Sequence, residues 1–260
     1  MPARLISAVG KDREGAYILE TLSRGGVDIE PLISTEMPTP KTVVLVNAAG
    51  ERAFLHRPGA SRNAFSDGLT LTPEMAAGCT RFHLANLFAL PGLRPHGADL
   101  LRQARALGLH TSADTGWDAR GEWMQVFGPC LREIELLFVN EDEARQLTGE
   151  SSAREAARAL REHGPDCVVL KLGAAGCLVV TGAGDTVVPG FRVSVVDSTG
   201  AGDCFTGMFL AALQRGCTWE DAARFANAAG ALNVQQLGAT RGARSWDDTA
   251  EWMRAAGPAQ

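Results

Sequence analysis

Short apolar runs alternate with segments of helical spacing along most of the chain, and this alternation limits the folds that the chain can adopt. The apolar runs that we expect to form strands cover residues 5–9, 81–85, 109–113, 136–139 and 167–170. The segments that we expect to form helices between them cover residues 13–24, 98–107, 141–148 and 152–163. Strands that alternate with helices favour a mostly parallel sheet with helices on its faces.

Two hairpins and three further helices complete the expected elements. The first hairpin joins residues 42–47 to 52–56, and the second joins residues 177–181 to 186–189, each through a glycine-containing turn. Such turns between two short apolar runs are typical of antiparallel strand pairs. The last helices are expected at residues 202–215, 218–236 and 246–255.

The composition predicts a globular protein without membrane or nucleic-acid partners. Hydrophobic residues make up 45% of the 260 residues and charged residues 21%, which allows a sizeable core. No run approaches the ~20 apolar residues of a membrane span, and residues 1–20 lack the apolar core of a secretory leader. The net charge of −5 argues against a general nucleic-acid-binding surface. The six cysteines are scattered without a Cys-x-x-Cys pair, which favours free thiols and a cytoplasmic location.

The strongest chemical signal is the string Asp197-Ser-Thr-Gly-Ala-Gly-Asp203, which leads into an apolar helix. Its small residues stand where that helix begins: Gly200, Ala201 and Gly202. The first N–H groups of a helix are unpaired and lie at the positive end of its dipole, so an anion can approach them closely there. The string predicts an anion hole for a transferring phosphoryl group, with Asp203 as the base for an attacking hydroxyl. An ordinary Asp in a first helical turn is the alternative.

This string resembles the second signature of the ribokinase-like, or PfkB-type, carbohydrate kinases. In that family the final Asp is the catalytic base, and the small residues before it bind the transferring phosphate. The resemblance implies that Asp203 is the base and that the three small residues form the hole. Met208 departs from the family, in which a small residue is usual at that position.

A second match is Asn140-Glu-Asp-Glu143, which follows an expected strand and opens an expected helix. It resembles the family's Asn-x-x-Glu motif, which orders magnesium and phosphates, partly through water. Oxygen ligands suit Mg²⁺, which usually keeps several waters. The resemblance implies that Asn140 and Glu143 serve Mg²⁺ and that Asn140 also serves the nucleotide. An acidic helix start capped by Asn140 is the alternative.

The third match is Lys171-Leu-Gly173-Ala-Ala-Gly176, directly after an expected strand. Related kinases place a Gly-x-x-Gly turn here against the phosphates and ribose of the nucleotide, so Gly173 and Gly176 are expected to bind it. Lys171 either points at phosphate or ends the strand, and the sequence leaves both open. A glycine turn between two strands is common without any ligand.

The fourth match is the helix around Asn227 with the loop at residues 238–242. In the family this helix borders the adenine pocket, and a residue matching Asn227 often contacts the nucleotide. The loop, which begins at Gly238, would close the pocket. Asp197 and this loop also match the region where many members bind a monovalent cation, so the resemblance extends to K⁺. Close helix packing is the alternative for the small residues around Asn227.

The resemblance runs over residues 4–245 and implies one ribokinase-like domain over residues 1–260. Its fold is a three-layer α/β/α sandwich with a mostly parallel central sheet and a reduced β lid at the first hairpin. The family normally carries more chain before the landmark that Gly10-Lys-Asp12-Arg-Glu-Gly15 resembles. We therefore expect an N-terminally incomplete domain with a complete nucleotide half and an exposed apolar edge around residues 5–9.

The sequence thus predicts an ATP-dependent kinase that phosphorylates a hydroxyl of a sugar or nucleoside with Mg²⁺, and it leaves a homodimer open. A non-catalytic nucleotide-binding or regulatory remnant of such a kinase, or a fragment, is the alternative. The chain contains no Gly-x-Gly-x-x-Gly and no Gly-x-x-x-x-Gly-Lys-Ser/Thr. Both a dinucleotide-binding oxidoreductase and a P-loop kinase are therefore poor explanations.

Overall fold

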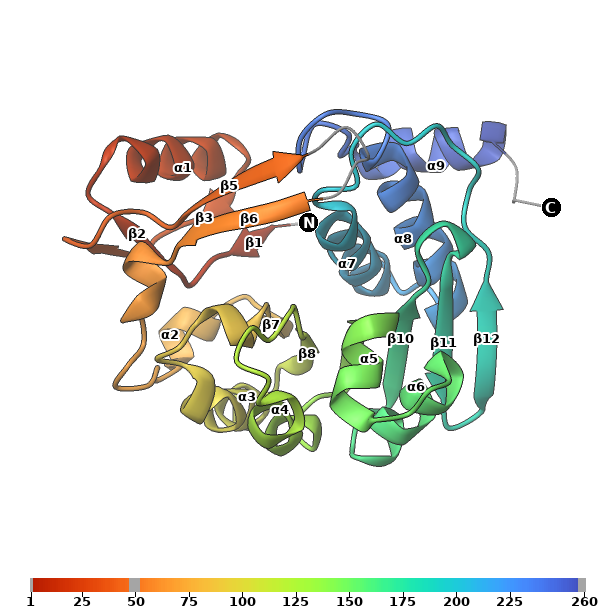
Figure 1. Ribbon diagram of the computed structural model, residues 1–260, viewed down its shortest axis with the longest axis horizontal. Helices are drawn as coiled ribbons and strands as arrows, with labels where there is room; N and C mark the ends of the chain where they lie inside the picture. Colours follow the sequence, from red (N-terminus) through yellow and green to blue (C-terminus); the bar gives the residue numbers. More distant parts are fainter. Residues whose placement is uncertain (1, 47–51, 257–260) are drawn as a thin grey trace. The chain divides into compact units, whose positions relative to one another are not determined.

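The alternating pattern folds into a six-stranded sheet in the order β12-β11-β10-β9-β8-β7 (Figure 1). This computed structural model describes residues 2–46 and 52–256. The strands are β7 (Arg81–Leu84), β8 (His110–Asp114), β9 (Leu136–Asn140), β10 (Cys167–Lys171), β11 (Cys177–Thr181) and β12 (Gly184–Val188). β8, β9 and β10 run parallel, and β11 and β12 continue the sheet as an antiparallel hairpin. The expected α/β fold with a mostly parallel central sheet and helices around it is confirmed.

The chain divides into two units. One comprises Met1–Thr111 with Thr115–Cys130, and the other comprises Ser112–Asp114 with Leu131–Gln260. A single domain over residues 1–260 stays a prediction. None of the described helices is long and apolar enough to cross a membrane.

The second unit packs helices on both faces of its strands because apolar residues occupy both sides of β9 and β10. Phe138 of β9 faces α7 (Ala201–Gln214), where its ring lies 5.2 Å from that of Phe209. Adjacent residues of a strand point to opposite faces, so Leu137 and Val139 face the other side, where α5 (Glu141–Thr148) and α6 (Ala153–Glu162) pack. α8 (Trp219–Asn233) packs against α7, and α9 (Trp246–Ala256) packs against α8. Burial of each large side chain contributes about 1.5–3 kcal/mol.

The first unit contains three two-stranded pairs beside its helices. β1 (Ala3–Arg4) pairs with β3 (Val27–Asp28), β2 (Ala8–Gly10) with β4 (Ile33–Thr35), and β5 (Lys41–Val46) with β6 (Arg52–Arg57). Its helices are α1 (Arg13–Arg24), α2 (Pro73–Ala76), α3 (Gly97–Ala106) and α4 (Trp123–Leu131), with 3-10 turns at Gly59–Arg62, Leu87–Ala89 and Arg94–His96. The β5–β6 pair matches the expected lid hairpin, whose turn at residues 48–51 lies outside the described residues.

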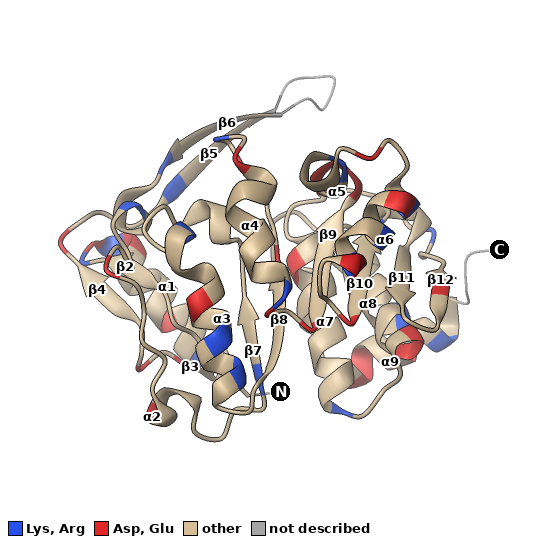
Figure 2. Cartoon of the chain, turned by 90° about the horizontal axis from the view of Figure 1, so that it is seen from below, with Lys and Arg blue, Asp and Glu red and all other residues tan. Residues whose placement is uncertain are grey.

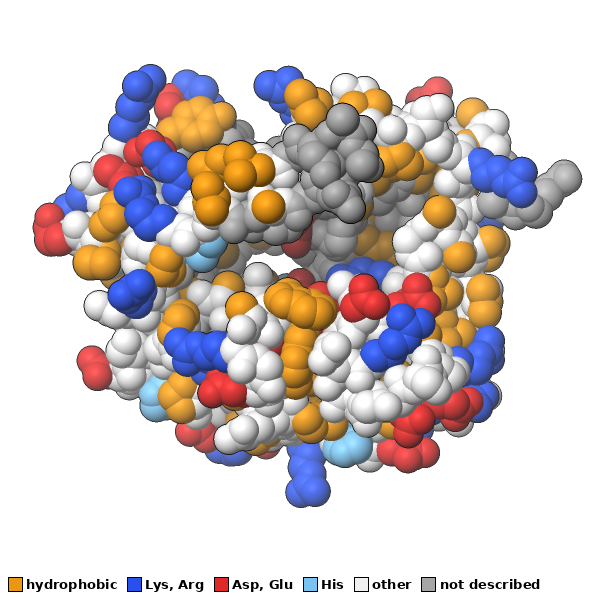
Figure 3. Space-filling view, viewed as in Figure 1, with side chains coloured by type: hydrophobic (Ala, Val, Ile, Leu, Met, Phe, Trp, Pro, Cys, Tyr) orange, Lys and Arg blue, Asp and Glu red, His pale blue; other side chains and the backbone are white. Residues whose placement is uncertain are grey.

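The expected strand at residues 5–9 is wrong in detail, because the chain forms β1 and β2 with a break between them. Ala8 and Val9 are only 7% and 5% exposed, so the expected apolar edge does not lie on β2 itself. The neighbouring β4 exposes Ile33 to 43%. The larger exposed apolar surface lies on the β5–β6 hairpin, at Val43, Val44, Leu45 and Leu55, where Figure 3 shows hydrophobic side chains.

Charges of both signs are interspersed over each unit in Figure 2. Several form exposed pairs, of which Arg158 with Glu155 is an example at 3.0 Å. Exposed pairs of this kind contribute about 0–1 kcal/mol each, so the fold depends mainly on its apolar core.

Candidate active site

The chain enters α7 through Gly200, whose φ of +75° lies in the left-handed region that favours glycine. A Cβ at this position would lie 2.1 Å from the carbonyl oxygen of Ala239, so a side chain cannot be accommodated. The N-cap residue of α7 is this glycine, which has no side chain to accept from the first N–H groups of the helix. The N–H groups of its first turn are therefore oriented toward an approaching anion, as the string of small residues predicts.

Lys171 lies beside this helix start. It is the last residue of β10 and is half-buried, and its Nζ lies 3.5 Å from the point that a Cβ on Gly202 would occupy. A larger residue at position 202 would crowd the ammonium group. The structure thus brings one cationic side chain and the positive end of a helix dipole to the same place, where both attract an anion.

Asp203 lies in the same first turn and is exposed. The opposite side of α7 anchors the helix in the core through Phe205 and Phe209, so Asp203 stands on the solvent side of a fixed helix. Burial, and then the charge of Asp203, raise the pKa of the neighbouring Cys204 thiol. That thiol therefore stays protonated at neutral pH, and the carboxylate is the group of the two that can accept a proton there. The role of Asp203 as the catalytic base stays a prediction.

Asp197 ties the loop before α7 to the chain after α8. One of its carboxylate oxygens accepts hydrogen bonds from the N–H (2.9 Å) and the hydroxyl (2.7 Å) of Thr199. The other accepts from the N–H of Gly238 at 3.0 Å. The carbonyl oxygen of Val234 accepts from the N–H groups of Val196 and Asp197. The structure therefore brings Asp197 and Gly238 together, as the resemblance implies, and gives Asp197 the role of a clamp.

Asn233 of α8 was not singled out from the sequence. Its side chain is fully buried, and its amide nitrogen donates to the carbonyl oxygen of Thr199 at 2.9 Å, one residue before Gly200. Its Oδ1 has no hydrogen-bond partner among the described residues. An Asn inside a helical segment of small residues gives no local sign of a partner 34 residues away.

Asn140 and Glu143 form a reciprocal helix cap at the end of β9. The Asn140 side chain accepts from the N–H of Glu143 at 2.8 Å, and the Glu143 carboxylate accepts from the N–H of Asn140 at 3.0 Å. Asn140 therefore caps α5, whichever further role it has. Asn140 is also the register partner of Lys171 on β10, so both residues end neighbouring parallel strands. A role toward Mg²⁺ stays a prediction.

The glycine turn after β10 has one open and one packed position. Gly173 (φ +59°) has no heavy atom of the described residues within 4 Å of where its Cβ would be. A Cβ at Gly176 would lie 2.2 Å from the carbonyl oxygen of Val188, so packing explains that glycine. Only Gly173 leaves its backbone open to a ligand.

Asn227 is only 7% exposed and has a structural partner. Its amide nitrogen donates to the carbonyl oxygens of Val188 (3.0 Å) and Pro189 (3.1 Å), which holds the end of β12 against α8. Both amide protons are used in this way. Contact between Asn227 and a nucleotide stays a prediction.

The residues at the start of α7 could hold the phosphates of a magnesium–nucleotide complex, but the described side chains do not form a metal site by themselves. The described residues contain no group of three or more His, Cys, Asp and Glu side chains that could hold a metal ion. Mg²⁺ does not require a group of this kind, because it usually binds one or two carboxylates together with phosphate oxygens and water. Exposed helix N–H groups and one lysine would hold the phosphates.

Comparisons with known proteins identify the family. Residues 2–246 match the model of the family described as "pfkB family carbohydrate kinase". The chain is 29% identical over 245 residues to aminoimidazole riboside kinase of Salmonella typhimurium, covering 90% of this chain and 76% of that protein. It is 31% identical over 242 residues to a nucleoside kinase of Methanothermobacter thermautotrophicus, covering 90% and 73%.

A solved structure shows the same fold with ligands. The structure of a putative ribokinase II from E. coli in complex with ATP and Mg²⁺ superposes with a TM-score of 0.84 at 25% identity, covering 98% of this chain and 84% of that one. The fold and the family match therefore agree, and the chain belongs to the pfkB family of carbohydrate kinases.

Proposed function

We propose that this kinase transfers the terminal phosphoryl group of ATP, bound with Mg²⁺, to a hydroxyl group of a sugar or nucleoside at the start of α7. The observation that carries the proposal is the position of the Lys171 ammonium beside Gly202 at a helix N-terminus whose N-cap residue is a glycine, with exposed Asp203 in the same turn. This combination attracts an anion and also supplies a base.

The helix start stabilises charge on the phosphoryl oxygens. Its N–H groups are fixed by Gly200, by the Asp197 clamp and by the bond from Asn233 to Thr199, so they need not reorganise during transfer. Donors fixed in advance are worth far more than mobile ones, and loss of a single donor typically lowers the rate about 10²–10³-fold. Lys171 adds a formal positive charge at the same point.

Asp203 removes the proton of the attacking hydroxyl. A sugar hydroxyl is a poor nucleophile at neutral pH, and a positioned base typically raises the rate about 10²–10⁴-fold. The carboxylate oxygen takes the proton as the hydroxyl oxygen bonds to the terminal phosphorus, and the bond from that phosphorus to the bridging oxygen of ADP breaks. ADP leaves with the electron pair of that bond, and the protonated Asp203 later returns its proton to water. Mg²⁺, when bound, would neutralise negative charge on the phosphates.

The remaining expected residues surround the nucleotide. Gly173 would allow the phosphates or ribose to approach the backbone, and Asn140 would reach the metal through water from its place beside Lys171. Gly176, Asn227 and Gly238 would shape the pocket by holding its loops, since each has a packing or hydrogen-bonding role.

We also assign a monovalent cation such as K⁺ to the clamp around Asp197. Its carboxylate and the carbonyl oxygen of Val234 converge on the same loop, and hard oxygen ligands suit an alkali cation. The cation would hold the loop before α7 in place. Titration of K⁺ against Na⁺ should then change kcat for transfer.

The location and assembly are further parts of the proposal. All six cysteines are free, which fits a reducing cytoplasm. Val43, Leu45 and Leu55 on the β5–β6 hairpin are 49%, 52% and 61% exposed, which favours burial of this hairpin in a homodimer.

The test is ADP formation with a panel of pentoses, hexoses, sugar acids and nucleosides. Asp203→Asn is nearly isosteric, so we expect it to keep ATP binding while kcat falls about 10²–10⁴-fold. Asp247→Asn, the same change in the first turn of α9, is the matched control and should leave kcat unchanged. Transfer by Asp203→Asn at the normal rate would contradict the assignment. Binding of ATP without transfer to any acceptor would favour the non-catalytic alternative.

A further inference from the structure

A pocket of about 310 Å³ lies between α6 and the turn that joins β11 to β12 (Figure 1). Two arginines of α6 line it, Arg158 and Arg161, together with Glu162 and the residues 180–185. Its volume is at the lower end of the range for small-molecule sites, about 300–1,000 Å³. All of these residues belong to the unit that contains Leu131–Gln260, so the whole pocket lies within one unit.

Arg158 has carboxylate partners on two sides. Asp185, whose side chain is 9% exposed, accepts from Arg158 at 2.8 Å and from Arg154 at 3.0 Å. Arg158 also pairs with Glu155 at 3.0 Å. The charge of Arg158 is therefore largely compensated within the protein, and its position on the pocket wall is fixed.

Arg161 differs from Arg158, because its guanidinium group makes no hydrogen bond or ion pair with a described residue. Its Nε is buried, and its Nη2 lies 2.8 Å from the point that a Cβ on Gly182 would occupy. The glycine thus leaves room for the guanidinium group against the turn. A buried donor without a partner is rare in folded proteins, and a bound ion is one of its ordinary explanations.

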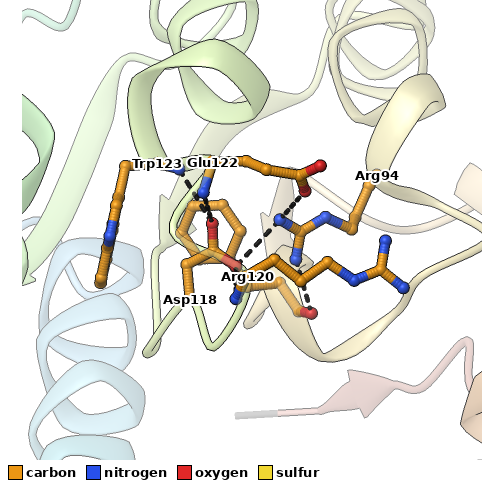
Figure 4. Close-up of polar contacts among 6 residues, drawn as sticks. Arg94, Asp118, Arg120, Glu122 and Trp123 are labelled. Carbon is orange, nitrogen blue, oxygen red and sulfur yellow. Dashed lines mark hydrogen bonds and ion pairs between the residues drawn. The ribbon is translucent and has the colours of Figure 1, made fainter.

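Arg94 of the other unit offers a comparison within the same chain (Figure 4). Its Nε is also buried without a partner among the described residues. Its terminal nitrogens, however, all have acceptors: Nη1 donates to the carbonyl oxygen of Phe88 at 3.2 Å, and Nη2 donates to Asp118 at 2.9 Å and to Glu122 at 2.5 Å. The two arginines therefore differ at their terminal nitrogens, which the protein satisfies in Arg94 and leaves to the pocket in Arg161.

The pocket is separate from the expected phosphate site at the start of α7. Lys171, at the carboxyl end of β10, pairs in register with Cys177 at the start of β11. Cys167, at the other end of β10, pairs with Thr181, which lines the pocket. The two ends of the strand are four residues apart, which corresponds to about 13 Å. A ligand beside Thr181 is thus at the opposite end of the strand from Lys171.

We propose that this pocket binds the phosphate group of a small phosphate ester, with Arg161 as its main ligand. A guanidinium group can donate two parallel hydrogen bonds to a phosphate, and the opposite charges strengthen them. A phosphate monoester carries about −1.5 to −2 charge at pH 7, so it gains more from an unpaired cation than a carboxylate does. The pocket is large enough to hold an organic group as well.

Glu162 opposes this binding to a small extent. It lines the same pocket, but it is exposed, so solvent and salt screen its repulsion of an anion. The proposed site does not depend on the proposed kinase function, because none of its residues belongs to the start of α7.

The test is a titration with glycerol 3-phosphate and with inorganic phosphate, followed by the amide NMR signals of residues 182–184. Shifts of these signals report a ligand in the pocket, whereas a ligand at the start of α7 shifts the signals of residues 200–203. Arg161→Met should raise the Kd measured at residues 182–184 about 10- to 150-fold, the usual effect of losing a hydrogen bond to a charged group. Arg161→Lys keeps the charge without the planar fork, so its Kd should fall between the two.

Glu162→Gln tests the charge balance in the opposite direction. It should lower the Kd about 1.5- to 5-fold, the range of an exposed charge interaction. Arg24→Met, which removes an exposed arginine from α1, is the control with the same change in net charge as Arg161→Met, and it should leave the Kd unchanged. All titrations are made at one ionic strength, because salt screens exposed charges.

The outcomes separate the site from its ligand. A lower Kd for glycerol 3-phosphate than for inorganic phosphate would support a phosphate ester, whereas equal Kd values would overturn the ester and keep the phosphate site. The site itself is overturned if millimolar ligand leaves the signals of residues 182–184 unshifted, or if Arg161→Met binds as the native chain does. Weaker binding in Glu162→Gln would also overturn it, because the ligand would then use that carboxylate as a partner. If Arg161→Met does not fold, Arg161→Lys and Glu162→Gln decide in the same way.

Discussion

Both the left-handed backbone and the close contact with Ala239 require glycine at position 200. We expect Gly200→Ala to lower the thermal stability and to displace the start of α7. The left-handed backbone alone costs a non-glycine residue about 1–2 kcal/mol, and the contact with Ala239 adds to it. Differential scanning calorimetry measures the change.

Gly207 provides the matched control in the same helix. A Cβ there meets no heavy atom of the described residues within 4 Å, and the residue is exposed. Gly207→Ala should therefore raise stability by about 0.5–1 kcal/mol, since alanine loses less backbone entropy in a helix. If Gly200→Ala and Gly207→Ala both unfold at or above the unfolding temperature of the native chain, the prediction that position 200 requires glycine is wrong.

Lys171 is the residue whose role the sequence left open between phosphate contact and strand end. With its ammonium beside Gly202, we expect Lys171→Met to raise the Kd for ATP about 10- to 150-fold, the usual effect of losing a hydrogen bond to a charged group. Lys11→Met, which removes an exposed lysine paired with Glu36, is the control and should leave the Kd unchanged. Isothermal titration measures both. An unchanged Kd in Lys171→Met would mean that this lysine ends the strand and does not contact phosphate.

The asparagines show how far single residues could be predicted. Asn140 stands three residues before Glu143, and that local spacing indicated a cap as one of its two possible roles. The partners of Asn227 and Asn233 lie on segments 34 to 39 residues away, and no local pattern encodes them. A sequence therefore reveals local hydrogen bonds more readily than tertiary ones.

At the scale of elements, segments with a clear apolar pattern were predicted well and interrupted ones were not. α1 was expected at residues 13–24 and forms there, because its amphipathic spacing and its Asp12 cap agree. α4 was missed, since Gly128 and Pro129 are typical helix breakers. The helix forms nevertheless because it buries Phe127 and Leu131 completely. Tertiary burial outweighs local preference there.

The cap of α1 makes a pH-dependent contribution to stability. Asp12 accepts hydrogen bonds from the hydroxyl and N–H of Thr39 and from the N–H of Gly15, which lower its pKa to about 2. The unfolded value is about 3.9, so this contribution is complete above pH ~4 and is lost as the pH falls toward 2. Asp12→Asn keeps a capping oxygen but removes the charge. We expect the native chain to be the more stable at pH 6, with a difference that shrinks between pH 4 and pH 2.

Urea denaturation at pH 6, 4 and 3 measures this difference. Asp67→Asn, which changes an exposed loop residue, is the control and should differ little from the native chain at any of these pH values. A stability difference between native and Asp12→Asn that is the same at pH 6 and pH 3 would contradict the assignment of the effect to the Asp12 charge.

At the scale of the whole molecule, the expected nucleotide residues all fall in one of the two units. Asn140, Lys171, Asp203, Asn227 and Gly238 lie within Leu131–Gln260. The fold class followed from the alternation of strands and helices and from the string at α7, because both are local sequence patterns. The division into two units could not be predicted in that way, since it depends on contacts between distant segments.

Because the nucleotide residues share one unit, ligand binding should stabilise that unit in a recognisable pattern. A ligand that binds only the native state adds RT ln(1 + [L]/Kd), about 2.7 kcal/mol at 100-fold over Kd. With MgATP at that excess we expect a higher unfolding temperature, and slower amide exchange at residues 171–176 and 197–203, where the backbone would contact phosphate. Residues 41–46 of β5 serve as the internal control and should exchange at the same rate with and without MgATP. Slower exchange at β5 alone, or an unchanged unfolding temperature at saturating MgATP, would contradict a phosphate site at the start of α7, because the bonds proposed there form only in the native state.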